Sequence, residues 1–574
     1  MFIEKIKIVN YRGLDLEIKD LKESFLIIGQ NDSGKTSLCN AIRKVLDFNI
    51  RRMPLTETDS TNLNHKNIEI YLRLNLKNIS SENKNRLGQL ISFEQKSNKY
   101  FVDAKLTAVF NFESMLYEEE LLLGDLETDA FKFQTNKFTP LDNILDLIYV
   151  SPSFNLDKQK KNFFINRQQK SVENEENIMP LVRQEVEKLN EEIQNEKSIS
   201  MLVDELNNQD GFSNIFEDVE FRIKSNIDIS NIYKSMDVFP FIKGSDDQIS
   251  IGDGKSKTLT MLLQKLSYAD DKEKIFIVEE PENHLYPLLQ QYYAFLTSKF
   301  KLGQAIYTSH SPYIFDFEKM KQIIKMIPEI TSGKKTISCK TLNILNDDFK
   351  SFGFLENIEL AEMMFYDAVL LVEGYSEKYF YNLLKIQDKQ FLNYLTKNRM
   401  GIFCVYGIDF APPKKLFEEL GIKVVIKTDN DLFKVPNKNE KRYAGIERVF
   451  DCLDDVGKEE LKCILEAKEL TKDSFKCNIG EENTNKIALT MGKIVSLFEK
   501  YNVYLSIHSD GFEKDFLDYI CCEPEKYDEY FNELKDSKLK NLHSLIVKNS
   551  IDISINDNNR HNVLVRFMNE RAHE

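Results

Sequence analysis

Gly29-Gln30-Asn31-Asp32-Ser33-Gly34-Lys35-Thr36 follows the apolar run of residues 25–28 and precedes a segment with leucine and isoleucine at helical spacing, residues 38–46. A strand, a glycine-containing loop and a helix form the context that the phosphate-binding pattern G-x-x-x-x-G-K-[ST] requires. The glycines let backbone N–H groups surround phosphate oxygens at the positive end of a helix. We therefore expect Lys35 to contact the β- and γ-phosphate oxygens of a nucleotide and Thr36 to bind Mg²⁺. The residues expected to bind the nucleotide here are Asn31, Asp32, Ser33, Gly34, Lys35, Thr36 and Ser37.

A second motif places acids at the end of a buried strand. The apolar run of residues 275–278 continues into Glu279-Glu280-Pro281-Glu282, where carboxylates can hold Mg²⁺ and orient the attacking water. By position, Glu279 is the acid on the metal side and Glu280 the one that activates water. His310 follows another short strand, residues 305–307, and could sense the γ-phosphate. A lone histidine there is more often a hydrogen-bonded structural residue, but the order of the motifs along the chain favours the functional interpretation.

The order of these motifs, with Asn10-Tyr11-Arg12-Gly13 near the start, resembles the ABC ATPases of the chromosome-maintenance and recombination-repair type. The resemblance implies that two heads share ATP head to tail, with a signature loop of one subunit closing on the phosphates of the other. The candidate loop is Ser250-Ile-Gly252-Asp-Gly254-Lys-Ser256, which departs from the usual Ser-Gly-Gly-Gln, so an ordinary glycine turn is the alternative. Glu279 in place of the usual aspartate is a second departure, and the glutamine-bearing loop is not assigned to any residue.

The second half of the chain has two further strand-end acid motifs. Residues 368–372 lead into Glu373-Gly374-Tyr375-Ser376-Glu377, and residues 423–428 lead into Asp429-Asn430-Asp431. Side chains alternate along an extended chain, so Asp429 and Asp431 point the same way and can reach one divalent metal ion. Taken alone, a strand-end Asp-Asn-Asp can equally be a turn or a helix cap.

Together these acid motifs resemble the Toprim domain of topoisomerases, primases and nucleases. The resemblance implies that Glu373, Asp429 and Asp431 hold Mg²⁺ or Mn²⁺, with Glu377 supporting them, and that the metal ions activate water. Residues 506–513, with Asp510 and Glu513, fall where the family has another acid, and Lys540 falls where it has a lysine that could stabilise the cleaved phosphate. Solvated surface charge is the alternative for these looser matches.

A basic segment follows the acids directly and could hold the DNA backbone, with a solvated loop as the alternative. Its residues are Lys434, Lys438, Lys441 and Arg442.

An ATPase followed by a Toprim domain is the layout of the OLD (overcoming lysogenisation defect) family nucleases, which include the nuclease subunit of Gabija systems and retron-associated relatives. The expected fold class is α/β: an ABC-type P-loop head with a helical dimerisation insertion, then a C-terminal Toprim domain. We expect head segments at 1–154 and 241–345, the insertion at 155–240, and the Toprim domain with C-terminal helical elements at 346–574.

Hydrophobic spacing supports parts of this division. Residues 68–76 alternate apolar and polar side chains, which predicts an antiparallel sheet with the strand-like run at 100–112. In the expected insertion, apolar residues at helical spacing predict a helix, either on the surface of its own domain or in a protruding dimerisation pair. These residues are Val182, Val186, Leu189 and Ile193.

Bulk composition sets the class of protein. The 574 residues are 42% apolar and 29% charged, which predicts a globular chain with more than one core. No apolar run approaches the roughly 20 residues that span a bilayer, and no signal-peptide core is visible, so we expect a cytoplasmic protein without membrane contact. The eight cysteines include no C-x-x-C pair, which argues against a structural metal cluster. A net charge of −15 does not exclude a local basic stripe, and nucleic-acid binding needs only such a stripe.

These features predict an ATP-regulated, metal-dependent DNA endonuclease of anti-phage defence that uses ATP and Mg²⁺ or Mn²⁺. Its expected partners are DNA, further copies in a homodimer or higher homo-oligomer, and a helicase or a reverse transcriptase with its DNA product. The alternative is a non-cleaving, ATP-driven DNA clamp or sensor in which the Toprim fold is a scaffold. A topoisomerase would need a tyrosine nucleophile on a DNA-gate domain and a primase usually a zinc module, and the sequence displays neither signature.

Overall fold

The computed structural model divides the chain into two compact units, Met1–Asp348 and Phe349–Glu574, and each is described by itself. The structure describes residues 1–77, 79–95, 98–126, 131–135, 138–152, 188, 190–209, 216, 218–225, 236–256, 258–259, 272–298, 303–315, 321–331, 333–343, 358–405, 409–430, 432–434, 440–467, 479–505, 512–517, 524–536 and 538–545.

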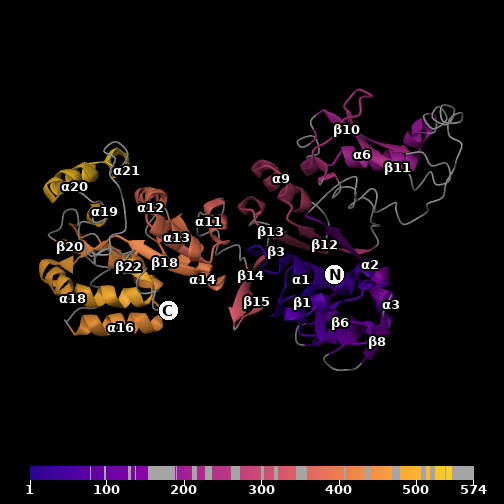
Figure 1. The fold of residues 1–574 in the computed structure, drawn as a ribbon, viewed down its shortest axis with the longest axis horizontal. Helices are drawn as coiled ribbons and strands as arrows, with labels where there is room; N and C mark the ends of the chain where they lie inside the picture. The colour runs from indigo at the N-terminus through magenta and orange to yellow at the C-terminus, as the bar shows by residue number, and fades with distance from the viewer. Residues whose placement is uncertain are drawn as a thin grey trace. The chain divides into compact units, whose positions relative to one another are not determined.

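Parallel strands form one end of the large sheet in the first unit (Figure 1). Their order is β14 (Gln322–Thr331), β3 (Ser24–Gly29), β13 (Gln304–Ser309), β12 (Glu273–Glu279) and β9 (Leu145–Val150). Residues 25–29, 275–279 and 304–309 are all buried, as expected for strands that are covered on both faces. Helix α1 (Lys35–Leu46) packs on this sheet through Leu38, Ile42 and Val45, which are at most 1% exposed.

The rest of this sheet is largely antiparallel. It continues from β14 through β15 (Lys334–Asn343), β2 (Leu14–Ile18), β1 (Phe2–Tyr11), β4 (Ile68–Asn75), β6 (Lys99–Asn111), β7 (Leu116–Asp125) and β8 (Phe131–Thr135), with β5 (Ser92–Glu94) beside β6. The predicted antiparallel pairing is confirmed, because β4 lies against β6 with Ile70 opposite Leu106. Other described α-helices of this unit include α2 (Phe48–Arg51), α3 (Ser81–Leu87), α6 (Lys197–Asn207) and α9 (Pro287–Ser298).

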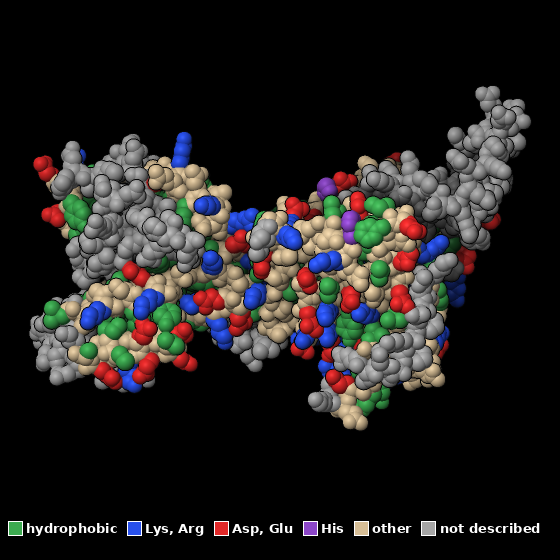
Figure 2. Space-filling model, turned by 60° about the horizontal axis from the view of Figure 1, so that its bottom comes forward, with side chains coloured by type: hydrophobic (Ala, Val, Ile, Leu, Met, Phe, Trp, Pro, Cys, Tyr) green, Lys and Arg blue, Asp and Glu red, His purple; other side chains and the backbone are tan. Residues whose placement is uncertain are grey.

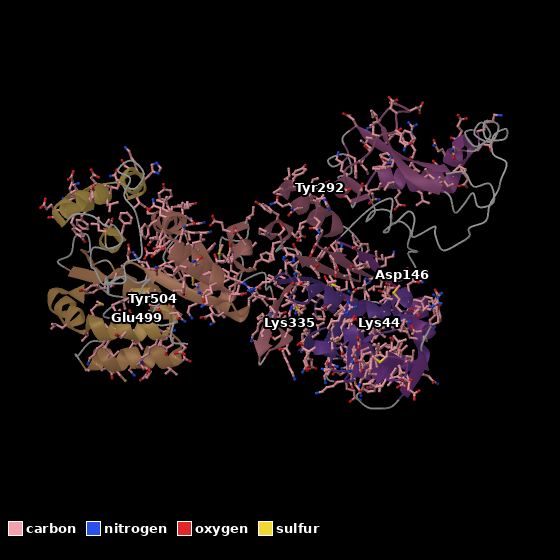
Figure 3. All side chains as sticks on the ribbon, in the orientation of Figure 1. Lys44, Asp146, Tyr292, Lys335, Glu499 and Tyr504 are labelled. Carbon is pink, nitrogen blue, oxygen red and sulfur yellow. The ribbon has the colours of Figure 1, made fainter. Side chains whose placement is uncertain are left out.

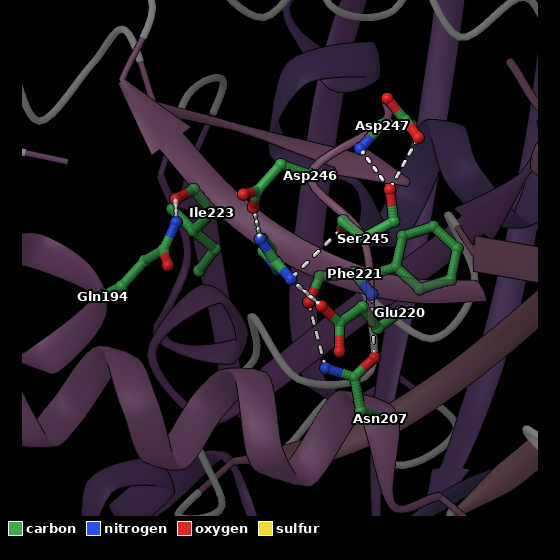
Figure 4. Close-up of polar contacts among 9 residues, drawn as sticks. Gln194, Asn207, Glu220, Phe221, Ile223, Ser245, Asp246 and Asp247 are labelled. Atoms are coloured by element: carbon green, nitrogen blue, oxygen red, sulfur yellow. Dashed lines mark hydrogen bonds and ion pairs between the residues drawn. The ribbon is translucent and has the colours of Figure 1, made fainter. Parts of the chain in front are cut away.

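The expected helical insertion at 155–240 contains a small sheet as well. Strands β10 (Val219–Ser225) and β11 (Met236–Ile242) pair antiparallel, and α6 packs against β10. The Asn207 amide donates to the Phe221 carbonyl at 3.0 Å and accepts from the Phe221 N–H at 2.9 Å, so the side chain replaces a strand partner for β10 (Figure 4). Of the four apolar residues that predicted a helix, Ile193 lies in a described helical segment, and Val182, Val186 and Leu189 lie outside the described residues. Dimerisation through this insertion stays a prediction.

The second unit contains a parallel sheet in the order β17 (Met400–Cys404), β16 (Ala368–Val372), β18 (Lys423–Thr428) and β22 (Val503–Leu505). Helices α12 (Tyr375–Gln387) and α13 (Lys389–Lys397) pack against β17, α14 (Ala411–Glu419) against β18, and α18 (Glu481–Lys500) against β22 (Figure 1). A small antiparallel sheet has β20 (Glu440–Tyr443) between β19 (Leu432–Lys434) and β21 (Ile479–Gly480). The other described helices of this unit include α11 (Ile358–Met363), α15 (Ala444–Val449), α16 (Asp455–Glu466), α19 (Phe512–Leu517), α20 (Tyr527–Asp536) and α21 (Lys538–His543).

The mixed α/β class predicted from the sequence is confirmed. The four-part division stays a prediction, and the separation near residue 348 lies close to its expected last boundary. Among the described helices, none combines the length and apolar character needed to cross a bilayer. On the face drawn in Figure 2, the coloured basic and acidic side chains are interspersed and form no large basic stripe.

Candidate functional site

The first group of predicted site residues gathers at one edge of the large sheet. Strands β3, β13 and β12 are parallel neighbours, with Ile28 opposite Ser309 and Thr308 opposite Glu279. Their carboxyl ends therefore meet at the same edge, which is where open α/β sheets bind ligands. This topology brings the phosphate loop, His310 and Glu280 together, although up to 280 residues separate them in the sequence.

A cavity of about 600 Å³ lies at this edge, within the size range of small-molecule sites. It brings together the seven predicted loop residues with Glu280 and His310, as expected. The cavity is lined by Arg12, Asn31, Asp32, Ser33, Gly34, Lys35, Thr36, Ser37, Glu280, His310, Lys335 and Ile337.

Position 34 favours glycine for two reasons: its backbone conformation is left-handed, and a neighbouring side chain leaves no space for a Cβ atom. Its φ of 89° lies in the left-handed region, and an added Cβ would be 2.5 Å from Ile337 Cδ1. Ile337 belongs to β15, and its N–H donates to the Gly13 carbonyl at 2.9 Å. On the same strand, Lys335 Nζ donates to the Asp32 carbonyl at 2.7 Å; Figure 3 labels Lys335. The β14–β15 hairpin thus contacts the phosphate loop through two side chains of β15, those of Lys335 and Ile337.

Lys35 is held beneath the loop. Its Nζ donates to the Gly29 carbonyl at 3.0 Å and to the Gln30 carbonyl at 2.9 Å. Burial lowers the Lys35 pKa to about 8, and the negative charges of Glu280, Glu282 and Glu279 oppose this shift. The ammonium group is therefore mostly protonated at neutral pH.

Glu280 and His310 face each other across the cavity edge. His310 Nε2 lies 3.6 Å from Glu280 Oε1, and the Asn283 amide donates to Glu280 Oε2 at 3.0 Å. The His310 backbone N–H donates to Glu282 Oε1 at 2.6 Å. Burial lowers the His310 pKa, and the nearby Lys35 charge adds to this shift. A neutral imidazole can offer one donor and one acceptor to a phosphate or a water molecule.

Glu279 does not line the cavity. It is 1% exposed, and its Oε2 accepts a hydrogen bond of 3.0 Å from the Tyr149 hydroxyl. The Arg43 guanidinium lies over the Tyr149 ring at 3.6 Å. Burial raises the pKa of Glu279. The structure thus separates the two adjacent glutamates, and the metal-ligand role of Glu279 with Thr36 stays a prediction.

The candidate signature loop lies against the turn that follows these acids. An added Cβ on Gly254 would be 2.5 Å from the His284 carbonyl oxygen, whereas one on Gly252 would meet nothing within 4 Å. Asp253 Oδ2 lies 3.9 Å from His284 Nδ1. Neither glycine lines the phosphate-loop cavity of its own chain.

The second group of predicted residues gathers where β16 and β18 end. These strands are parallel neighbours, with Leu371 opposite Ile426, so Glu373 and Asp429 emerge side by side. Glu373 Oε1 accepts from the Asp429 N–H at 3.1 Å and from the Thr428 hydroxyl. Each acid also has a basic partner: Arg448 Nη1 lies 2.6 Å from Glu373 Oε1, and Lys427 Nζ lies 2.9 Å from Asp429 Oδ1.

Glu377 lies beside these acids on the first turn of α12. It is 5% exposed, and its Oε2 accepts from the Gly374 N–H at 2.6 Å. Burial raises the Glu377 pKa to about 8, and the charges of Asp429 and Glu373 add to the shift while Lys427 opposes it. The structure therefore brings Glu373, Glu377 and Asp429 together.

The remaining predicted residues are only partly described. Glu513 is 6% exposed on α19, and Lys540 is exposed on α21. Asp431, Asp510 and Lys438 lie outside the described residues, as do the side chains of Lys434, Lys441 and Arg442.

The donor chemistry at Glu373 and Asp429 fits Mg²⁺ or Mn²⁺, which prefer oxygen ligands. Within the described part of the chain, no group of three histidine, cysteine or acidic side chains is arranged to hold a metal ion. A third ligand from Asp431 therefore stays a prediction.

Several residues of these sites carry no motif signal in the sequence. Arg448 and Lys427 contact the acids, Lys335 lines the nucleotide cavity, and Tyr149 binds Glu279. Arg12 also lines the cavity and pairs with Asp59 at 2.7 Å. Arg12 and Lys427 belong to stretches that the sequence brings to attention, residues 10–13 and the predicted strand 423–428.

Comparison with known proteins gives matches in both units. Residues 1–315 match the AAA ATPase domain family, and residues 364–431 match the family described as "Overcoming lysogenization defect protein-like, TOPRIM domain". Endonuclease GajA of Bacillus cereus (strain VD045) is 27% identical over 488 residues, which are 80% of this chain and 80% of that protein.

Among solved structures, an Smc head domain from Pyrococcus furiosus is 12% identical with a TM-score of 0.37, covering 62% of this chain and 99% of that one. The SMC head domain from Thermotoga maritima is 10% identical with a TM-score of 0.29, covering 59% and 98%.

Proposed function

Since this chain belongs to the AAA ATPase domain family and has the OLD-like Toprim domain of the OLD-family nucleases, we propose that it is a metal-dependent DNA endonuclease of anti-phage defence whose cleavage is regulated by ATP. The observation that carries this proposal is the contact between Glu373 and Asp429. Glu373 Oε1 accepts a 3.1 Å hydrogen bond from the Asp429 backbone N–H at adjacent strand ends. Burial and the charges of both acids raise the pKa of Glu377, so three carboxyl groups lie close together although this is electrostatically unfavourable. An arrangement with this cost is typical of a site that acts on a substrate or a cation.

In the proposed nuclease site, Glu373, Asp429 and Asp431 would hold Mg²⁺ or Mn²⁺. When bound, the ions would activate water and offset charge on the leaving oxygen. Lys427 and Arg448 reduce the repulsion between the acids, and Glu377 supports the site from the first turn of α12. Asp510, Glu513 and Lys540 are proposed as further residues of this site.

In the proposed ATPase site, Lys35 and residues 31–37 hold the phosphates. Glu280 would orient the attacking water, because Asn283 fixes one of its oxygens and His310 faces the other. Thr36 and Glu279 would serve the Mg²⁺ ion of the nucleotide. Gly252 and Gly254 do not line the nucleotide cavity of their own chain, which supports contact with the nucleotide bound to a second copy. Such contact would require a homodimer or a higher homo-oligomer.

The proposed substrate is DNA, and the proposed location is the cytoplasm. The basic residues that follow the Toprim acids, Lys434 to Arg442, would hold the DNA backbone. The partner proposed from the family resemblance is a helicase, or a reverse transcriptase with its DNA product.

Plasmid or phage DNA incubated with Mg²⁺ or Mn²⁺ tests the proposal. We expect cleavage by the native chain and its loss in Asp429→Asn, which keeps the side-chain shape but removes the charge. Asp367→Asn is the matched control, because Asp367 pairs with Arg399 away from the acids. Equal cleavage by the native chain and Asp429→Asn removes the nuclease assignment.

The pairing of Glu373 with Arg448 and of Asp429 with Lys427 is the observation that favours the alternative, a non-cleaving ATP-driven DNA clamp or sensor. Acids already neutralised by basic side chains can simply stabilise a scaffold. Calorimetric titration with Mn²⁺ separates the two functions. If the chain is a clamp, we expect no Mn²⁺ binding that depends on Asp429.

A further inference from the structure

Lys335 reaches the phosphate loop from a distant part of the chain. It lies on β15, and its Nζ donates to the Asp32 carbonyl at 2.7 Å. This strand packs against the loop, because the Ile337 side chain fills the space beside Gly34 and the Ile337 N–H donates to the Gly13 carbonyl. Lys335 and Ile337 are two residues apart on a strand and therefore point to the same face. The ammonium group is thus held at the nucleotide cavity, which Lys335 lines.

The loop residue that Lys335 contacts is an acid in an uncommon backbone conformation. Asp32 has a φ of 61°, which lies in the left-handed region that few residues other than glycine, asparagine and aspartate adopt. It is exposed and lines the cavity. A carboxylate at this place repels the phosphate groups of a nucleotide. An additional positive charge close to Asp32 would therefore favour the binding of a polyphosphate.

The balance of charges around the cavity depends on Lys335. The charged side chains of the lining are three basic and two acidic ones, namely Arg12, Lys35, Lys335, Asp32 and Glu280. The imidazole of His310 adds little positive charge, because burial lowers its pKa. Without Lys335, acidic and basic side chains would be equal in number, and the lining side chains would contribute no net attraction for a polyphosphate.

We propose that Lys335 is a phosphate-binding residue of the nucleotide site, supplied by β15: its ammonium group holds the Asp32 carbonyl and binds a phosphate oxygen of ATP at the same time. This inference rests on the proposed ATPase site. An ammonium group has three N–H donors, so one bond to a carbonyl is compatible with a second bond to a phosphate. The carbonyl bond also holds the lysine side chain in place before the nucleotide arrives, which reduces the entropy lost on binding.

Calorimetry of the full-length chain with Mg²⁺ and the non-hydrolysable ATP analogue AMP-PNP tests the proposal. Lys335→Gln keeps a donor for the Asp32 carbonyl but removes the charge. We expect binding to weaken about 10-fold, the lower end of the effect of losing a hydrogen bond between charged groups. Added NaCl should weaken binding less in Lys335→Gln than in the native chain, because one screened attraction is gone. Lys335→Arg keeps the charge and should bind AMP-PNP with nearly native affinity.

Lys334→Gln is the matched control. Lys334 precedes Lys335 on the same strand, is exposed and does not line the cavity, since side chains alternate along a strand. Its loss should change neither the affinity nor the salt dependence. Native affinity in Lys335→Gln, or an equal loss in Lys334→Gln, overturns the inference. If circular dichroism shows that Lys335→Gln does not fold, Lys335→Thr, an uncharged residue suited to a strand, takes its place under the same criteria.

A double-variant comparison separates phosphate binding from simple neutralisation of Asp32. Asp32→Asn removes the acidic charge, and asparagine tolerates the left-handed conformation. We expect Lys335→Gln to weaken binding by a similar factor in this background, because the partner of the charge is the nucleotide. Disappearance of the effect would mean that Lys335 acts only on Asp32, and the inference would be wrong.

Failure of the inference and failure of the ATPase site give different results. If the native chain does not bind AMP-PNP, the proposed ATPase site itself is rejected. If the native chain binds AMP-PNP and Lys335→Gln binds it equally well, only the role of Lys335 is rejected.

Discussion

Tyr149 on β9 donates a hydrogen bond of 3.0 Å to Glu279 at the end of the neighbouring strand β12. Arg43 from α1 covers the ring of this tyrosine at 3.6 Å, so three elements meet around one buried carboxylate. The longer glutamate, in the place where the resemblance predicts aspartate, is thus held by a partner outside the nucleotide cavity. We infer that Tyr149 positions Glu279.

Removing the Tyr149 hydroxyl tests this relationship. In Tyr149→Phe, the buried Glu279 oxygen loses its donor, and we expect a loss of about 1–3 kcal/mol in stability of the first unit. ATP hydrolysis should fall with it, since the carboxylate is no longer oriented. Thermal unfolding and phosphate release measure the two effects. Tyr100→Phe, at a tyrosine that is 46% exposed, is the control and should leave both unchanged.

Gly34 offers a test of the phosphate loop with a closely matched control. Gly34→Ala has to place a methyl group 2.5 Å from Ile337 Cδ1 at a φ of 89°, so we expect nucleotide binding to be lost. Gly88 also has a positive φ, 52°, but an added Cβ there meets nothing within 4 Å. Gly88→Ala should therefore cost about 1–3 kcal/mol of local backbone strain and leave nucleotide binding intact. Titration with a fluorescent ATP analogue distinguishes the two variants; native affinity in Gly34→Ala would contradict the loop geometry.

The lowered pKa of His310 predicts a pH dependence of stability. The folded state keeps this imidazole neutral at pH values where the unfolded chain, with its ordinary pKa near 6.5, already binds a proton. Its contribution to stability is therefore present above about pH 6.5 and declines as the pH falls from there toward the folded pKa. His310→Gln removes this contribution. Unfolding midpoints at pH 7.5, 6.5 and 5.5 should drop more steeply for the native chain than for the variant, and parallel profiles would refute the prediction.

The buried pair of Lys427 and Asp429 should stabilise the second unit. Lys427→Met leaves the Asp429 charge buried without this partner, and we expect a loss of about 3–5 kcal/mol. Lys500 pairs with Glu460 at a similar distance, 3.0 Å, but both side chains are exposed. Lys500→Met should therefore cost about 0–1 kcal/mol. Limited proteolysis and thermal unfolding of the full-length chain measure the stability loss in each variant. Equal stability losses in the two variants would contradict the prediction that the buried ion pair contributes more than the exposed one.

Local motifs were the predictable part of the site. Residues 29–36 specify a strand, a loop and a helix because their conformational requirements lie within eight neighbouring residues, and the cavity contains the predicted residues 31–37. Glu280 and His310 could also be predicted, because short apolar strands precede both and parallel strands end at one edge. The sequence pattern does not predict the two-stranded sheet β10–β11, because the apolar residues before it are at helical spacing.

The sequence by itself determined which short segments bear phosphate-loop and acid motifs, and the order in which the two units follow each other. Only the tertiary structure decided which distant side chains meet those motifs: Arg448 on Glu373, and Lys335 on the phosphate loop. The physical reason is the distance along the chain between the residues that determine each feature. A motif is fixed by the conformations of adjacent residues, whereas an ion pair between distant residues exists only after packing brings their elements together. The same packing separates Glu279 from Glu280, neighbours in sequence that face different surroundings, one buried against Tyr149 and one lining the cavity.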